Sequence, residues 1–162
     1  MAITYGLVKY GYAFAPGASA RGMNSATAKA MVMQVPSDGG ETILVVDDDD
    51  LVLPAAKSLI EKLGYRVLTA CNGPEALEIL RQDTPIDLLF TDVFMPGGMH
   101  GPQLANAARR LRPELKVVFT SGFFEYAEIR QGLDPRIEQI SKPYEPNALA
   151  EKLRDVLDSS SQ

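Results

Sequence analysis

The feature of this sequence that most restricts its fold is an alternation of short apolar runs and helical patterns from residue 41 onward. The runs are apolar almost throughout, rather than alternately apolar and polar, which is typical of strands buried on both faces of a sheet. Between and after the runs, apolar residues recur every three or four positions, the pattern of an amphipathic helix. Five such units predict an α/β fold: a doubly wound, five-stranded parallel sheet with helices on both faces.

The expected elements follow from these patterns. Strands are expected at residues 43–46, 65–70, 86–91, 117–120 and 137–140, and helices at residues 51–63, 74–80, 102–111, 123–130 and 147–157. Gly64 suits the C-terminal cap of the first helix, and Pro74 suits the first turn of the second. Four aspartates, residues 47–50, lead from the first strand into the first helix, and Asp49 or Asp50 is expected to cap that helix.

Charged and hydroxyl side chains follow the ends of four of the five expected strands. Asp47 and Asp48 follow the first strand, Asp92 follows the third, Thr120 ends the fourth and Lys142 follows the fifth. In open parallel sheets the functional crevice lies at the carboxyl ends of the strands, so these side chains are expected to converge. Three carboxylates suit a magnesium-type cation, whereas an ammonium and a hydroxyl suit phosphoryl oxygens. The pattern therefore predicts a site that accepts phosphate onto a carboxylate.

Four segments carry a resemblance to a known family. These are ILVVDDD, DLLFTDVFMPGGMHG, VVFTSG and SKPY. Through them, residues 42–158 resemble a response-regulator receiver domain of two-component signalling, which has a flavodoxin-like fold. We place the receiver domain at residues 41–158, between an N-terminal extension or linker at residues 1–40 and a C-terminal tail at residues 159–162.

The resemblance implies how the site handles phosphate. Asp92 matches the aspartate that becomes phosphorylated, and Thr120 matches the switch hydroxyl that turns toward the phosphoryl group. Lys142 matches the lysine that contacts that group, and a cis peptide bond is expected before Pro143. The implied phosphoryl donor is the phosphohistidine of a histidine kinase or of a histidine phosphotransfer protein. Phosphorylation would switch a protein-interaction surface toward a downstream partner that the sequence does not identify.

The same resemblance implies a magnesium site. Asp47 and Asp48 match the acidic pair that organises Mg²⁺, while Asp92 and the backbone carbonyl of Phe94 match its further ligands. The chain is then a signalling phosphoacceptor, with self-catalysed phosphotransfer and dephosphorylation only, and not a turnover enzyme.

One position departs from the family pattern. Gln139 stands three residues before the lysine, where the best-known receivers have an aromatic residue that moves with the threonine. The usual coupling between threonine and aromatic ring is therefore in doubt. Nearby rings that can substitute are Phe123, Phe124 and Tyr144.

The first forty residues have two interpretations. The segments ITYGLVK and AMVMQVP are similar to the tail of a histidine-kinase ATP-binding domain, which in hybrid histidine kinases leads into a C-terminal receiver. The other interpretation is an extension of the receiver, with or without an amphipathic segment packed on it. The residues leave both open.

Composition excludes several other classes of function. A net charge of −5 and the lack of any Lys/Arg run argue against direct nucleic-acid binding. No apolar run approaches the roughly 20 residues that span a bilayer, and no signal peptide is expected. The only cysteine, Cys71, excludes an internal disulfide and suits a cytoplasmic protein; it is expected to be a buried spectator. The only histidine, His100, is expected to face solvent in a loop, and a homodimer is compatible with the sequence.

Two alternatives belong to other functional classes. One is a pseudo-receiver, an interaction scaffold with this fold that is never phosphorylated. The other is a haloacid-dehalogenase-like phosphatase, because Asp48-Asp49-Asp50-Leu51-Val52 satisfies the pattern D-x-D-x-[TV] of that family. The phosphatase interpretation lacks an acidic pair after Lys142 and assigns no role to Asp92.

Overall fold

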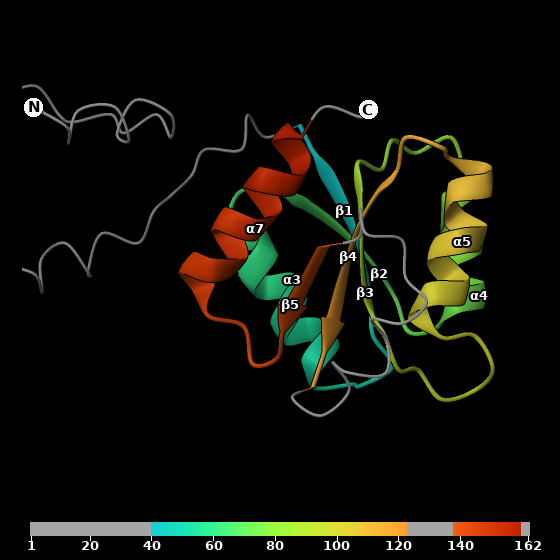
Figure 1. Ribbon diagram of the computed structural model, residues 1–162, viewed down its shortest axis with the longest axis horizontal. Helices are drawn as coiled ribbons and strands as arrows, with labels where there is room; N and C mark the ends of the chain where they lie inside the picture. Colours follow the sequence, from blue (N-terminus) through green and yellow to red (C-terminus); the bar gives the residue numbers. More distant parts are fainter. Residues whose placement is uncertain (1–39, 123–137, 160–162) are drawn as a thin grey trace, which may run out of the picture. The chain divides into compact units, whose positions relative to one another are not determined.

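The computed structural model describes residues 40–122 and 138–159, which form alternating strands and helices (Figure 1). In chain order they are β1 (Thr42–Val46), α3 (Val52–Lys62), β2 (Arg66–Ala70), α4 (Gly73–Leu80), β3 (Leu88–Asp92), α5 (Gly101–Leu111), β4 (Lys116–Ser121), β5 (Glu138–Ser141) and α7 (Pro146–Asp158). None of the helices in these two ranges has the length and apolar character needed to span a membrane.

The five strands form one parallel sheet, as the sequence predicted. Their order is β2-β1-β3-β4-β5, and all four neighbouring pairs are parallel. Figure 1 shows α3 and α7 on one face of the sheet and α4 and α5 on the other. The strand order reverses beside β1, so the crevice expected in a doubly wound sheet lies at the carboxyl ends of β1 and β3.

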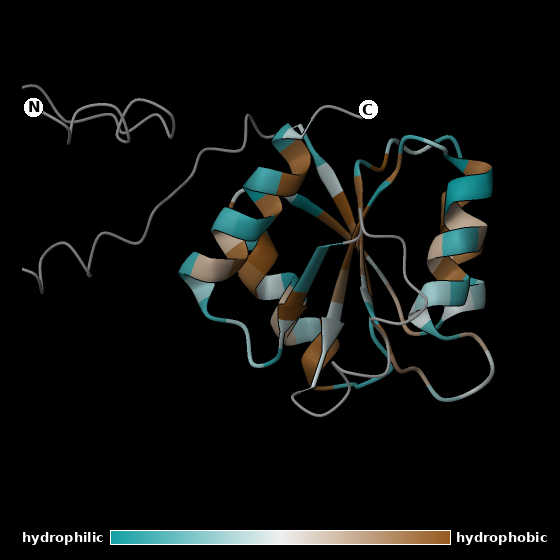
Figure 2. Ribbon diagram, viewed as in Figure 1, coloured by the Kyte–Doolittle hydropathy of each residue, from teal (hydrophilic) through white to brown (hydrophobic). Residues whose placement is uncertain are grey.

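The buried core follows the central strands. Every residue of β1 and β3 is buried, and so is β4 except for its first residue, whereas the edge strands β2 and β5 are largely half-buried or exposed. In Figure 2 the helices turn their hydrophobic sides toward the sheet and their hydrophilic sides outward. Central strands covered on both faces form a rigid base for the side chains that follow them.

Side-chain hydrogen bonds and a glycine stabilise the ends of α3 and α4. Asp49 Oδ1 accepts hydrogen bonds from the backbone N–H groups of Leu51 (2.8 Å) and Val52 (3.1 Å), which stabilises the start of α3. These two bonds lower the pKa of Asp49. Gly64 has a φ of 96° just beyond α3, the left-handed conformation expected of a C-terminal glycine. Asn72 caps α4 by accepting from the backbone N–H of Glu75 at 2.9 Å.

The limits of some elements differ from the expected ones. β3 begins at Leu88 rather than at residue 86, and α5 begins one residue early, at Gly101. The expected helix at residues 123–130 lies outside the described residues, as does the first residue of the expected fifth strand. The division of the chain near residue 40 stays a prediction.

The expectation that Cys71 is buried was wrong. Cys71 is exposed, although Ala70 directly before it is fully buried. The reason is that edge strand β2 ends at Ala70, so Cys71 already belongs to the turn that leads into α4. Its Sγ donates to Glu75 Oε2 at 2.9 Å, and this carboxylate raises the pKa of the thiol.

Arg112 joins the ends of two helices, and its loss should destabilise the fold. Its guanidinium donates to the carbonyls of Leu80 (2.9 Å), Gln82 (2.6 Å) and Thr84 (2.9 Å), at and beyond the end of α4. Hydrogen bonds from a charged donor stabilise by about 1.5–3 kcal/mol each, less where water competes, so Arg112→Ala should lower the free energy of unfolding in urea by about 2 kcal/mol. The exposed Arg110→Ala serves as control, with an expected change within about 0.5 kcal/mol. Equal effects of the two substitutions would contradict this role.

Candidate functional site

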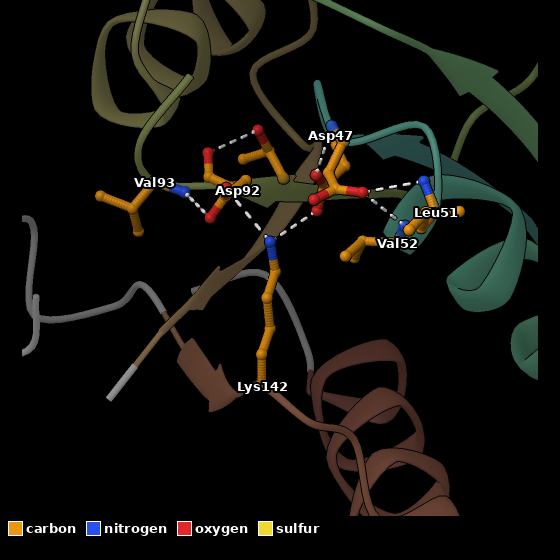
Figure 3. Close-up of polar contacts among 8 residues, drawn as sticks. Asp47, Leu51, Val52, Asp92, Val93 and Lys142 are labelled. Atoms are coloured by element: carbon orange, nitrogen blue, oxygen red, sulfur yellow. Dashed lines mark hydrogen bonds and ion pairs between the residues drawn. The ribbon is translucent and has the colours of Figure 1, made fainter. Parts of the chain in front are cut away.

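Three of the polar residues predicted from the strand ends, Asp47, Asp92 and Lys142, meet at the carboxyl edge of the sheet (Figure 3). Asp47 directly follows β1, Asp92 is the last residue of β3, and Lys142 directly follows β5. Thr120 lies in β4 directly opposite Asp92 in the register of the sheet. The register of a parallel sheet thus brings together side chains that are up to 95 residues apart in the sequence.

Lys142 connects the two buried acids of the site. Its Nζ lies 2.6 Å from Asp47 Oδ2 and 3.1 Å from Asp92 Oδ2. The side chains of Asp47 and Asp92 are only 3% and 12% exposed, and that of Lys142 is 20% exposed. Two carboxylates this close repel each other strongly when water is excluded, so the shared ammonium stabilises their arrangement.

Backbone groups fix the orientation of both carboxylates. The N–H of Val93 donates to Asp92 Oδ1 at 2.8 Å (Figure 3). The N–H of Asp49 donates to Asp47 Oδ1 at 3.0 Å. Each acid therefore has one oxygen held by the backbone and the other directed toward Lys142. This arrangement holds the reactive oxygens of the site before any ligand arrives.

Burial and neighbouring charges shift the pKa values of Asp92 and Lys142 in opposite directions. Burial raises the pKa of Asp92, and the nearby ammonium of Lys142 only partly opposes that rise. Burial alone would lower the pKa of Lys142, but its hydrogen bond to Asp47 and the neighbouring acidic groups raise the pKa overall. Lys142 is therefore firmly protonated at neutral pH and can bind an anionic group.

Three carboxylates of the site fit a divalent cation. Asp47, Asp48 and Asp92 each offer one oxygen, and these three oxygens lie within 4.8 Å of one another. Opposite ligands of an octahedral Mg²⁺ ion are about 4.2 Å apart, so small side-chain rotations suffice. Phe94, whose carbonyl is the further predicted ligand, lies two residues beyond Asp92 and is 50% exposed. That carbonyl's role stays a prediction.

Two hydroxyl groups of the site lack partners within the described part of the chain. Thr120 Oγ1 and the Tyr144 hydroxyl oxygen are both buried and form no hydrogen bond of standard geometry there. The Tyr144 ring packs edge-on against Phe90, with 5.6 Å between ring centroids. Burial raises the pKa of Tyr144 to about 12, although the neighbouring Thr120 hydroxyl and Lys142 ammonium act to lower it.

Gly101 is a residue of the site that reading the sequence missed. A Cβ atom at Gly101 would lie 2.3 Å from the backbone oxygen of Asp92 and 3.0 Å from Val93 Cα. The start of α5 therefore packs directly on the backbone that carries Asp92, and only glycine fits there. The preceding His100 is exposed, as expected, and its ring contacts that of Phe94 at 5.3 Å.

Comparisons with known proteins agree with this geometry. The family model of the response regulator receiver domain matches residues 43–154. The response regulator receiver protein CpdR of Brucella abortus (strain 2308) is 37% identical over 116 residues, covering 71% of this chain and 94% of CpdR. The sensor kinase CckA of the same organism is 34% identical over 122 residues, covering 74% of this chain but only 13% of the kinase.

Solved structures show the same fold. The receiver domain of the hybrid histidine kinase CckA superposes with a TM-score of 0.61 at 35% identity, covering 72% of this chain and 99% of that domain. A response regulator receiver protein from Sinorhizobium medicae WSM419 superposes with a TM-score of 0.66 at 27% identity, covering 74% and 95% of the two chains.

The phosphatase interpretation is not favoured by the site. It requires Asp48 and Asp50 as the reactive pair, but Asp50 is exposed. The acids that pair with Lys142 are instead Asp47 and Asp92. The site is thus organised around Asp92, the residue to which that interpretation assigned no role.

Proposed function

This chain belongs to the response regulator receiver domain family of two-component signalling, and we propose that its Asp92 accepts a phosphoryl group from a phosphohistidine. The observation that carries the proposal is the position of Lys142 Nζ between Asp47 Oδ2 and Asp92 Oδ2. A cation placed between a buried nucleophile and a second acid can attract an incoming phosphoryl group and balance its charge.

The residues divide the transfer between them. An oxygen of Asp92 attacks the phosphorus atom of the phosphohistidine, the P–N bond breaks, and its electron pair leaves with the imidazole nitrogen. Lys142 contacts the oxygens of the transferred group, and the Val93 N–H holds the other Asp92 oxygen in place. Thr120, directly opposite Asp92, donates its hydroxyl to the new phosphoryl group.

The proposed ligands of Mg²⁺ are Asp47, Asp48, Asp92 and the Phe94 carbonyl. When bound there, Mg²⁺ would offset the negative charge of the carboxylates and of the phosphoryl oxygens. The close approach of the three carboxylate oxygens supports this assignment. The side chain of Asp48 is half-buried, so one side of the ion would keep water ligands, as Mg²⁺ prefers.

The proposed partners follow from the reaction. The donor is a histidine kinase or a histidine phosphotransfer protein, and phosphorylation shifts an equilibrium between surface conformations that a downstream protein reads. The setting is the cytoplasm, and the chain acts as a signalling phosphoacceptor rather than as a turnover enzyme. Residues 41–158 form the proposed receiver, and residues 1–40 are an N-terminal extension or linker with segments similar to the end of a histidine-kinase ATP-binding domain.

Intact mass spectrometry after incubation with acetyl phosphate and Mg²⁺ tests the proposal. We expect one added phosphoryl group on the wild-type chain, none on Asp92→Asn, and none on the wild type with a chelator present. Because some receivers accept phosphate only from their kinase, binding of beryllofluoride is the second measurement. If both reagents leave the wild type unchanged, the chain is a scaffold and Asp92 is not a phosphoacceptor.

Magnesium should stabilise the folded chain through the acidic residues. Mg²⁺ that binds only the folded state increases the free energy of unfolding, by about 2.7 kcal/mol when its concentration is a hundredfold above its dissociation constant. The melting temperature rises as a result. The rise measured by thermal unfolding should be much smaller in Asp48→Asn, which removes one ligand. Asp83→Asn, an exposed acid after α4, serves as control and should respond like the wild type. Equal shifts in all three proteins would refute the metal site.

A further inference from the structure

The two hydroxyl groups at the end of β4 suggest how the site stabilises a bound phosphoryl group. Thr120 is only 1% exposed, and neither its Oγ1 nor the Tyr144 hydroxyl has a hydrogen-bond partner within the described residues. Buried hydroxyls are rarely left without partners in folded proteins, and exceptions often have a functional reason. Both groups belong to the same site, since Thr120 is opposite Asp92 and Tyr144 follows Lys142 by two residues.

The ring of Tyr144 is held on the same face of the sheet as Asp92 and Thr120. It packs edge-on against Phe90, which lies two residues before Asp92 on β3. Side chains two residues apart on a strand point to the same face, and paired residues of neighbouring strands also share a face. Tyr144 is close enough to Thr120 for the Thr120 hydroxyl to affect its pKa.

Gln139 lies differently with respect to Thr120. It is paired with Phe119, whereas Thr120 is paired with Ile140. Because successive side chains of a strand point to opposite faces, Gln139 lies on the face opposite to that of Thr120. The position three residues before the lysine therefore does not share the face of the sheet on which Tyr144 and Thr120 lie.

We propose that Tyr144 is a positioning residue for Thr120: its hydroxyl donates to Thr120 Oγ1 while Thr120 donates to a phosphoryl oxygen on Asp92. The inference rests on the proposed phosphoacceptor function. A phosphoryl group offers only acceptors, so Thr120 must be the donor in that contact, and its oxygen lone pairs then remain for Tyr144. Each hydrogen bond of such a chain strengthens the next, and the chain gives both buried hydroxyls a partner.

The burial of Tyr144 supports this role. The Tyr144 phenol is protonated at neutral pH like any tyrosine, and burial raises its pKa further, so it is available as a donor. The contact with Phe90 holds the ring on the strand that carries Asp92, so little reorganisation is required when the phosphoryl group arrives. Tyr144 thus links the phosphorylated site to the loop that begins α7.

The test is a double-mutant cycle that measures binding of beryllofluoride, a phosphoryl mimic, in the presence of Mg²⁺. Tyr144→Phe keeps the ring and removes the hydroxyl, and Thr120→Val removes the other hydroxyl with little change in shape. We expect Tyr144→Phe to weaken binding about three- to tenfold, the effect of one net hydrogen bond, and to leave the melting temperature without beryllofluoride unchanged or higher. In the Thr120→Val background, Tyr144→Phe should have no effect on binding.

Carbon-13 NMR of the tyrosine Cζ atom supplies an independent readout. The Tyr144 resonance, identified by its loss in Tyr144→Phe, should shift when beryllofluoride binds the wild type and should not shift in Thr120→Val at saturating beryllofluoride. Wild-type affinity in Tyr144→Phe, or the same loss in both backgrounds, would overturn the inference and leave the phosphoacceptor function intact. If the wild type fails to bind beryllofluoride and to accept phosphate from acetyl phosphate, the proposed function itself fails, and the inference with it.

Discussion

Gly101→Ala is expected to destabilise the chain by about 2–3 kcal/mol and to slow phosphorylation of Asp92 by tenfold or more. The new Cβ would lie 2.3 Å from the backbone oxygen of Asp92, a distance that no non-bonded pair of heavy atoms tolerates. Overpacking of this kind costs about 1–3 kcal/mol or more, because the rigid surroundings must move. Either the start of α5 or the end of β3 has to shift.

The effect on phosphorylation follows from the position of the clash. The blocking atoms belong to the backbone of Asp92 and Val93, which cannot rotate away as the end of a side chain can. The Gly101 N–H also donates to the carbonyl of Val93 at 2.9 Å. A shift of the start of α5 would therefore also displace the backbone of Val93, next to Asp92. A displacement near 1 Å at a reacting group reduces rates by about a hundredfold, which is the upper range expected here.

Urea unfolding and the rate of phosphorylation by acetyl phosphate check this expectation, with Gly40→Ala as the matched control. A Cβ at Gly40 would have no atom within 4 Å, so its stability should change by less than about 0.5 kcal/mol and its rate should stay that of the wild type. If Gly101→Ala resembles this control in both measurements, the close contact below Asp92 has no importance for the site.

The second large effect is expected for Lys142→Met, which keeps most of the side chain but removes its charge. The substitution should lower the free energy of unfolding without Mg²⁺ by about 3 kcal/mol, because it leaves the buried Asp47 and Asp92 without their shared cation. It should also slow phosphorylation by about a hundredfold or more, since the ammonium no longer stabilises the transferred group.

Added Mg²⁺ separates these two consequences. A bound ion would restore part of the lost stability, because its charge would offset that of Asp47, Asp48 and Asp92, but it would not restore the contact of Lys142 with the phosphoryl oxygens. The control is Lys152→Met, whose partner Glu138 is 52% exposed. An exposed pair contributes about 0–1 kcal/mol, so this control should stay close to the wild type in urea unfolding and in phosphorylation. If Lys142→Met has the same stability and phosphorylation rate as Lys152→Met, the proposed role of Lys142 is contradicted.

The fold itself was largely predictable from the sequence. A continuous apolar strand such as residues 43–46 has side chains on both faces that must be buried, as they are in a parallel sheet between two layers of helices. The runs therefore predicted such a sheet, and the structure confirmed it. The role of an aspartate side chain just before α3 and of Gly64 just beyond it was also predictable, because each depends on local backbone geometry and a few neighbouring residues. The N-cap position itself is Leu51 rather than Asp49 or Asp50.

The acidic residues and the lysine were predictable as a group, because parallel strands bring their carboxyl ends to one edge of the sheet. Asp47, Asp92 and Lys142 could therefore be placed together before any distance was known. The exposure of Cys71 was missed although the end of its strand at residue 70 was predicted correctly. Whether the first residue of the following turn is buried depends on how remote segments pack around it, and local sequence patterns do not show this.

The sequence by itself determined the layers of the fold, the order of its elements and the chemical groups at the carboxyl ends of the strands, because these depend on local periodicity and on residue type. Only the tertiary structure decided which groups come into contact. It placed Lys142 between two acids, packed Gly101 against the backbone of Asp92, and put Tyr144 rather than Gln139 on the face of Thr120. Such contacts depend on strand register and on distances of a few ångströms between remote segments, which local sequence patterns do not encode.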